Sequence, residues 1–142
     1  MKILNDNIYN WPAGLEEGRK NRDLVPLPEE NNLELIIGEK NCYLLSVIYS
    51  SDEMTIGKMV LPVNKYSEME SHKGDEVVNV IKGRLTINIY SDEENVNPRS
   101  VSKSSYVIDE GEKMLIPEGY RHVYKNIYEG NVEALIVIAP EL

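Results

Sequence analysis

From Leu33 onward, apolar and polar residues alternate with a period of two in short runs, and this pattern constrains the fold more than any other feature of the sequence. Successive side chains of a β-strand point to opposite faces, so such runs predict strands that are buried on one face. The runs are also rich in Val, Ile and Tyr, which suit a pleated surface. The predicted strands cover residues 33–37, 43–49, 58–63, 76–81, 85–90, 106–109, 113–116, 122–126 and 132–138.

Turn signals separate the predicted strands, among them Gly74-Asp75, Lys82-Gly83 and Glu110-Gly111. No long amphipathic helix is expected after residue 32, and short strands at this spacing predict an all-β sandwich or barrel. The polar stretch 91–105 is expected to be a surface loop. Residues 1–32 lack the alternation, so we expect an irregular N-terminal arm (1–32) followed by one barrel domain (33–142).

Length and charge narrow the classes of function. A chain of 142 residues can bury one core. The net charge of −9 argues against nucleic acid and anionic membranes as partners, because both need a basic surface. The N-terminus lacks the apolar segment of a signal peptide, and the single Cys42 fits a reducing compartment. These features predict a cytoplasmic protein whose partner is a small molecule.

The chain has two histidines, and each stands in a segment with other candidate ligands. In the first segment, Glu70 and His72 would share a face of an extended chain, and Glu76 opens the next strand. In the second, a Gly-Glu-Lys strand start is followed by a Pro-x-Gly turn that can direct His122 toward the first segment. The two segments predict one shared site.

These two segments resemble the two motifs of the cupin family. The second motif, G(x)5PxG(x)2H(x)3N, is filled at every position by Gly111, Pro117, Gly119, His122 and Asn126. The first motif, G(x)5HxH(x)3,4E(x)6G, is matched at His72, Glu76 and Gly83. It departs at the opening glycine, because Gly57 lies too far upstream. It also departs at the first histidine position, which Glu70 occupies.

The resemblance implies a cupin-type double-stranded β-helix, or jelly-roll barrel, that holds one divalent metal inside. The implied ligands are His72, Glu76 and His122, with Glu70 in the fourth position. Two imidazoles and a carboxylate suit Fe, Mn, Ni, Co or Zn, and a second carboxylate would favour a harder metal such as Mn or Fe(II) over Cu. A Glu-x-His first motif is also similar to that of the manganese-dependent ureidoglycine aminohydrolase type of cupin, which supports Glu70 as a ligand. In the alternative, the metal has been lost and Glu70 faces solvent.

Three further side chains are candidates for roles at this site. Tyr124 shares strand parity with His122, and Tyr49 shares parity with Tyr43 on a face that is expected to line the barrel. A phenol beside a metal can orient or protonate a substrate, so Tyr49 and Tyr124 are candidate catalytic residues. Glu70, if it is not a ligand, is a candidate general base.

Two functional hypotheses follow from these residues. The first is a metal-dependent enzyme acting on a small polar metabolite, with isomerase, lyase or decarboxylase, aminohydrolase and dioxygenase chemistry all open. The second is a non-catalytic ligand-binding or sensor cupin, which could be free of metal. Because barrel edges and an arm without a core of its own both need cover, we also expect a homodimer in which the arm takes part.

Overall fold

The computed structural model describes residues 26–90 and 104–139. Within them the chain forms nine β-strands, which match the nine predicted runs, and one short 3₁₀ helix, η1 (Glu29–Asn31). The strands are β1 (Leu33–Ile37), β2 (Tyr43–Ser50), β3 (Thr55–Leu61), β4 (Asp75–Lys82), β5 (Arg84–Ile89), β6 (Ser104–Asp109), β7 (Lys113–Ile116), β8 (His122–Lys125) and β9 (Val132–Ala139). The prediction of an all-β fold is therefore confirmed.

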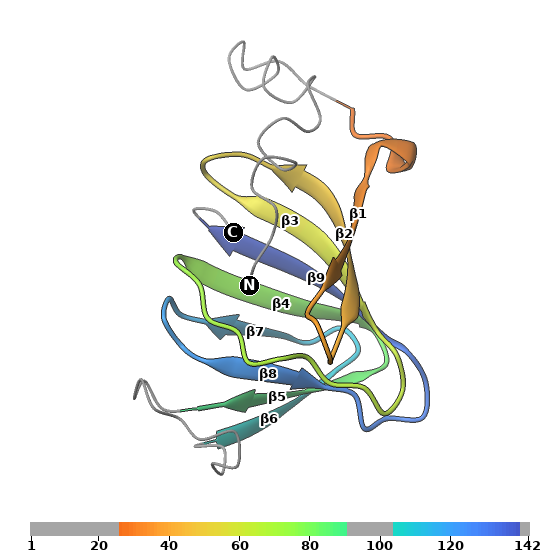
Figure 1. Ribbon diagram of the computed structural model, residues 1–142, viewed down its shortest axis with the longest axis vertical. Helices are drawn as coiled ribbons and strands as arrows, with labels where there is room; N and C mark the ends of the chain where they lie inside the picture. The colour runs from red at the N-terminus through yellow and green to blue at the C-terminus, as the bar shows by residue number, and fades with distance from the viewer. Residues whose placement is uncertain (1–25, 91–103, 140–142) are drawn as a thin grey trace.

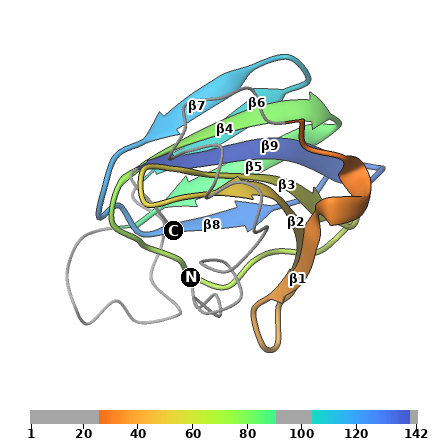
Figure 2. The same ribbon diagram turned by 90° about the horizontal axis from the view of Figure 1, so that it is seen from above.

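The strands form two antiparallel sheets. The larger has the order β1-β2-β3-β9-β4-β7, and the smaller has the order β6-β5-β8. Figure 1 shows the smaller sheet below the larger one, and Figure 2 shows the chain from above, with β4, β9 and β3 lying over β5 and β8. Strands β4 and β5 are adjacent in sequence but belong to different sheets, so the turn at Gly83 carries the chain from one layer to the other.

The core lies between the two sheets and follows from the alternation in the sequence. Along β3 and β9, buried and half-buried side chains alternate almost without interruption, as expected for strands with one face toward a core. The largest fully buried apolar side chains come from both sheets: Tyr124, Leu45, Met59, Leu61, Leu85, Ile87, Ile116, Ile138, Val47 and Val78.

A β-bulge in β2 changes the expected direction of Tyr49. Val47 pairs with Gly57, but Tyr49 pairs with Ile56, so Ile48 is an extra residue that shifts the register. Paired residues share a face of the sheet, and Ile56 lies on the half-buried face opposite the core. The expectation that Tyr49 lines the barrel with Tyr43 is therefore wrong. Ser50 turns inward instead and hydrogen-bonds the Thr55 hydroxyl at 2.9 Å.

Parts of two predicted segments lie outside the described residues. Of the predicted arm 1–32, residues 26–32 are described, and they contain η1 and lead into β1. Of the predicted loop 91–105, residues 91–103 lie outside the description, and Ser104 and Ser105 already belong to β6. In the described ranges, no helix has the length and apolarity required to cross a membrane.

Gly83 and Gly111 both have positive φ, so they offer a matched test of how tightly the β4–β5 turn at Gly83 is packed. Gly83 (φ +88°) and Gly111 (φ +85°) both have a backbone conformation that costs an L-residue about 1–2 kcal/mol. A Cβ at Gly83 would also lie 2.9 Å from the Asn131 carbonyl oxygen, whereas a Cβ at Gly111 would meet nothing within 4 Å. We expect Gly83→Ala to lower the free energy of unfolding by about 1–3 kcal/mol more than Gly111→Ala, measured by urea denaturation. Equal losses would contradict a packing role for this turn.

Candidate metal centre

The centre forms where the segment before β4 meets the start of β8. Glu70 and His122 face each other in an isolated antiparallel bridge, in which each backbone N–H donates to the other's carbonyl oxygen at 2.9 Å. The Pro-x-Gly turn before β8 is fixed to the same segment, because the Gly119 N–H donates to the His72 carbonyl oxygen at 3.3 Å. Glu76 is the second residue of β4. The main chain thus brings all four predicted ligands together.

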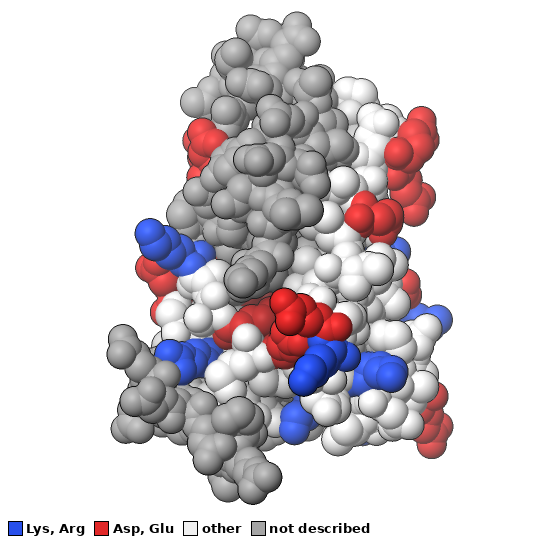
Figure 3. All heavy atoms as spheres, in the orientation of Figure 1, with Lys and Arg blue, Asp and Glu red and all other residues white. Residues whose placement is uncertain are grey.

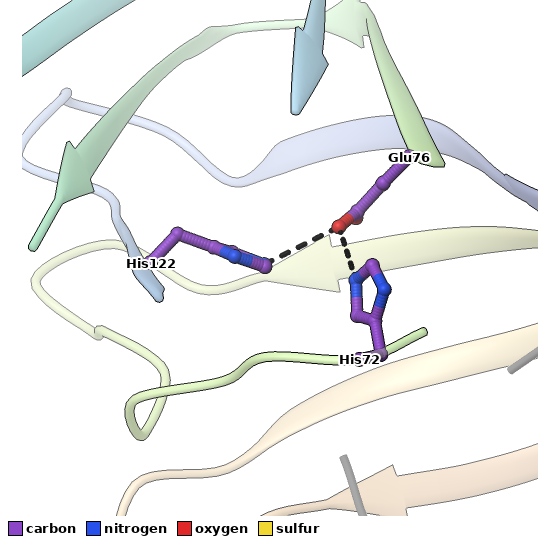
Figure 4. Close-up of side chains that lie close together, drawn as sticks. All are labelled: His72, Glu76 and His122. Carbon is purple, nitrogen blue, oxygen red and sulfur yellow. Dashed lines mark hydrogen bonds and ion pairs between the residues drawn. The ribbon is translucent and has the colours of Figure 1, made fainter. Parts of the chain in front are cut away.

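His72, Glu76 and His122 form the inner cluster, and Figure 4 shows their side chains pointing toward one another. One carboxylate oxygen, Oε2 of Glu76, lies 2.8 Å from Nε2 of His72 and 3.3 Å from Nε2 of His122. One potential ligand atom from each residue lies within 4.8 Å of the others. Glu76 and His122 are fully buried and His72 is almost so, with 7% of its side chain exposed.

Glu70 stands beside this cluster and is buried too, with 5% exposure. Its Oε2 lies 3.6 Å from Nε2 of His122. The alternative in which Glu70 points to solvent therefore does not describe this structure. Glu70 also borders a surface cavity of about 430 Å³ between the β1–β2 turn and the segment before β4, lined further by Ile36, Ile37, Gly38, Glu39, Glu68 and Met69.

A backbone contact fixes the orientation of the His122 ring. Its Nδ1 lies 3.0 Å from the carbonyl oxygen of Tyr120. A carbonyl oxygen can only accept a hydrogen bond, so Nδ1 carries the proton and donates it. With Nδ1 bonded to the main chain, Nε2 is the ring nitrogen that faces the carboxylates, as in the usual second-shell arrangement of metal-binding histidines.

The buried charges at the centre shift the pKa values of its members. Burial alone would lower the pKa of His122, but the carboxylates of Glu70 and Glu76 outweigh it and raise the pKa to about 10. Burial alone would raise the pKa of Glu76, but its interactions with the two imidazoles outweigh it and lower the pKa to about 2. Without a metal ion, therefore, an imidazolium supplies the positive charge that the carboxylates require.

Two buried tyrosines donate hydrogen bonds to the carboxylates of the centre, in each case to Oε1 and not to the Oε2 atom that faces the histidines. The Tyr43 hydroxyl donates to Oε1 of Glu70 at 2.7 Å, and the Tyr124 hydroxyl donates to Oε1 of Glu76. Burial, followed by the nearby carboxylate charges, raises the pKa of both phenols well above the ordinary value. Both hydroxyls therefore remain protonated donors at neutral pH.

Two buried polar atoms inside this centre, Oε2 of Glu70 and Nε2 of His122, have no hydrogen-bond partner, as expected of metal ligands. Among the described residues, the buried side-chain nitrogen and oxygen atoms without a hydrogen-bond partner are Oε2 of Glu70, Nδ1 of His72 and Nε2 of His122. Buried polar atoms are nearly always paired, so such a concentration in one place needs an explanation. Nε2 of His122 lies 3.3 Å from Oε2 of Glu76, and Oε2 of Glu70 lies 3.6 Å from the same Nε2. One cation bound between them would satisfy both unpartnered atoms. The residues present therefore fit a divalent metal.

The geometry sorts the residues that the sequence suggested. His72, Glu76 and His122 converge, Glu70 adjoins them, and Tyr124 contacts Glu76. Tyr49, the other predicted catalytic tyrosine, is half-buried on the opposite face of its strand. Tyr43 takes the position that Tyr49 was expected to share, and its contact with Glu70 was not predicted. Tyr43 alternates with Leu45 and Val47 in the sequence, and this pattern could have indicated that its side chain points into the barrel.

Asn126, the last residue of the second motif, has a structural role at the end of β3. It is fully buried, and its amide nitrogen donates to the carbonyl oxygens of Leu61 and Gly130 at 2.9 and 2.8 Å. Its side-chain oxygen accepts the backbone N–H of Tyr128 at 2.9 Å. Asn126 therefore ties the end of β3 to the turn that follows β8.

Charged side chains on the described surface do not form a single basic area on the visible face. Figure 3 shows Lys and Arg side chains scattered among Asp and Glu on the face seen in Figure 1. The half-buried Lys58–Glu133 pair at 3.7 Å and the exposed Arg84–Asp109 pair at 2.6 Å show the same mixing of signs.

Comparison with solved structures places the fold. An Fe(II)-bound HppE has a TM-score of 0.67 at 14% identity, covering 82% of this chain and 60% of that one. A predicted oxalate decarboxylase from Thermotoga maritima has a TM-score of 0.63 at 16% identity, covering 82% and 99%. An RmlC-like cupin with a double-stranded β-helix from Methanocaldococcus jannaschii has a TM-score of 0.56 at 15% identity, covering 84% and 91%.

No protein-family model matches the chain, and no curated protein matches its sequence. The solved structures nevertheless agree with the two sheets described above. The protein has the double-stranded β-helix fold of the cupins, and the prediction of this jelly-roll barrel is confirmed.

The role of Asn126 can be tested with an isosteric change. Asn126→Asp replaces the amide donor with an oxygen that faces two backbone carbonyl oxygens, so we expect the free energy of unfolding to fall by about 3 kcal/mol. Asn131→Asp, at an exposed position, is the control and is expected to change stability by less than about 0.5 kcal/mol. Similar urea-denaturation midpoints for the two variants would refute the structural role of Asn126.

Proposed function

We propose that this protein binds one divalent transition metal through His72, Glu76 and His122, with Glu70 as the fourth ligand, and acts on a small polar metabolite. The observation that carries the proposal is the convergence of these side chains in a buried place where Oε2 of Glu70 and Nε2 of His122 have no hydrogen-bond partner. The cupin fold supports it, because structures with this fold include an Fe(II)-bound protein and a predicted oxalate decarboxylase.

The donor set favours some metals over others. Two imidazole nitrogens and two carboxylate oxygens suit Mn or Fe(II) better than Cu, and the two carboxylates neutralise a divalent charge. Bound there, the metal would supply Lewis-acid chemistry or a site for O₂. The chain's own residues would hold the ligand atoms in place, exclude bulk water from the buried carboxylates, and keep two protonated phenols next to them. Isomerase, lyase or decarboxylase, aminohydrolase and dioxygenase chemistry are all compatible with such a centre.

Metal content is the direct test of this function. We expect wild-type protein, loaded with Fe(II) or Mn(II) and dialysed, to retain about one metal per chain, measured by inductively coupled plasma mass spectrometry. His72→Ala and Glu76→Gln should lose the metal, and Glu129→Gln, at an exposed position, should retain it. Free metal at 100 times its Kd should raise the free energy of unfolding of the wild type by about 2.7 kcal/mol.

The opposite result has a definite meaning. Wild-type protein that stays metal-free after incubation with Fe(II), Mn(II), Ni(II) and Zn(II) would refute the metal-dependent function. It would favour the second hypothesis, a ligand-binding or sensor barrel. Circular dichroism of each variant separates loss of metal from loss of fold. The homodimer and the cytoplasmic location stay predictions from the sequence.

Position 70 should set the choice of metal. Glu70→His replaces an oxygen donor with a nitrogen donor, which favours Ni and Zn relative to Mn. In equilibrium dialysis against equal Mn(II) and Ni(II), we expect the bound Ni:Mn ratio to rise roughly tenfold, a change of about 1.4 kcal/mol. Glu129→His adds an imidazole away from the centre and serves as the control. An unchanged ratio in Glu70→His would show that Glu70 is not a ligand.

A further inference from the structure

The two carboxylates of the centre are held in the same way by different strands. Tyr43 on β2 donates to Oε1 of Glu70 at 2.7 Å, and Tyr124 on β8 donates to Oε1 of Glu76. Both tyrosines are buried, with exposures of 2% and 0%, and their rings meet edge to face at 6.1 Å between centroids. The two rings thus pack against each other, and each hydroxyl bonds one of the two carboxylates.

Each carboxylate is consequently divided between two environments. One oxygen accepts a phenol hydrogen bond, and the other, Oε2, faces the imidazoles. In Glu76 this second oxygen lies near both histidines, and in Glu70 it is the buried atom without a hydrogen-bond partner. A carboxylate otherwise turns readily about its last torsion, which is broad and roughly two-fold. A charge-assisted O–H···O⁻ bond of this length opposes such turning.

We propose that Tyr43 and Tyr124 are positioning residues that confine Glu70 and Glu76 to ligation of the metal through one oxygen each. The inference rests on the proposed metal-binding function and adds to it. A metal with two nitrogen and two single-oxygen ligands keeps positions free for a substrate, whereas carboxylates that bind through both oxygens would fill them. Outer-shell hydrogen bonds to ligands commonly change metal affinity 10–100-fold when they are removed.

The test uses Co(II)-loaded protein and the variants Tyr43→Phe and Tyr124→Phe. Each variant removes one hydroxyl and keeps the ring, so the packed pair is preserved. Tyr106→Phe on β6, where the side chain is 45% exposed, is the control. The visible d–d absorption of high-spin Co(II) weakens as its coordination number rises, so it reports directly on how the carboxylates bind.

We expect Tyr43→Phe and Tyr124→Phe each to weaken Co(II) binding about 10–100-fold. We also expect the visible absorption to decrease as the released carboxylate binds through both oxygens. Tyr106→Phe should match the wild type in both measurements. Wild-type affinity and absorption in both tyrosine variants would overturn the proposal and leave the metal-binding function standing. Failure of the wild type to bind Co(II) at a His72-dependent site is the separate failure of the proposed function.

A double-mutant cycle distinguishes positioning from a general structural effect. If Tyr43 acts through Glu70, the Tyr43→Phe change should have no further effect on Co(II) affinity in a Glu70→Gln protein. The same fold-loss in both backgrounds would show that Tyr43 supports the barrel rather than the ligand. The equivalent cycle of Tyr124 with Glu76 provides a second test on the other carboxylate.

Discussion

The centre of this barrel is organised by the need to keep two carboxylates inside it. Glu70 and Glu76 are 5% and 1% exposed, and an isolated buried charge is too costly to persist without partners. Neighbouring groups provide those partners. Each carboxylate accepts a hydrogen bond from one phenol at Oε1, and an imidazolium at His122 faces the Oε2 atoms. The imidazolium carries one positive charge, whereas a divalent cation would carry two and would neutralise both carboxylates.

The scaffold meets this requirement with main-chain contacts. The segment before β4 pairs with the start of β8, and the Pro-x-Gly turn is held by the His72 carbonyl oxygen and by the Asp75 carboxylate, which accepts the Glu118 N–H at 3.0 Å. Both contacts use backbone N–H groups, which almost any residue provides. The motif residues with positive φ, Gly83, Gly111 and Gly119, allow the sharp bends that bring the two segments together.

The sequence predicted the strands and the inner cluster well, because both depend on local patterns. Alternation of side chains located all nine strands, and motif spacing located His72, Glu76 and His122. It misplaced Tyr49, because one extra residue at Ile48 reverses strand parity and leaves no mark in the composition. It also missed the Tyr43–Glu70 contact, which joins residues 27 positions apart and arises only when the barrel closes.

The backbone bridge between Glu70 and His122 bears on which side chains position 70 can carry. It consists of two backbone hydrogen bonds, so it is indifferent to the side chain at position 70. The backbone pairing therefore allows a nitrogen donor to replace the oxygen donor at this position while His72, Glu76 and His122 keep their places. The main-chain pairing and the donor atom at position 70 are therefore separate properties of this barrel, and the donor atom can change without the pairing.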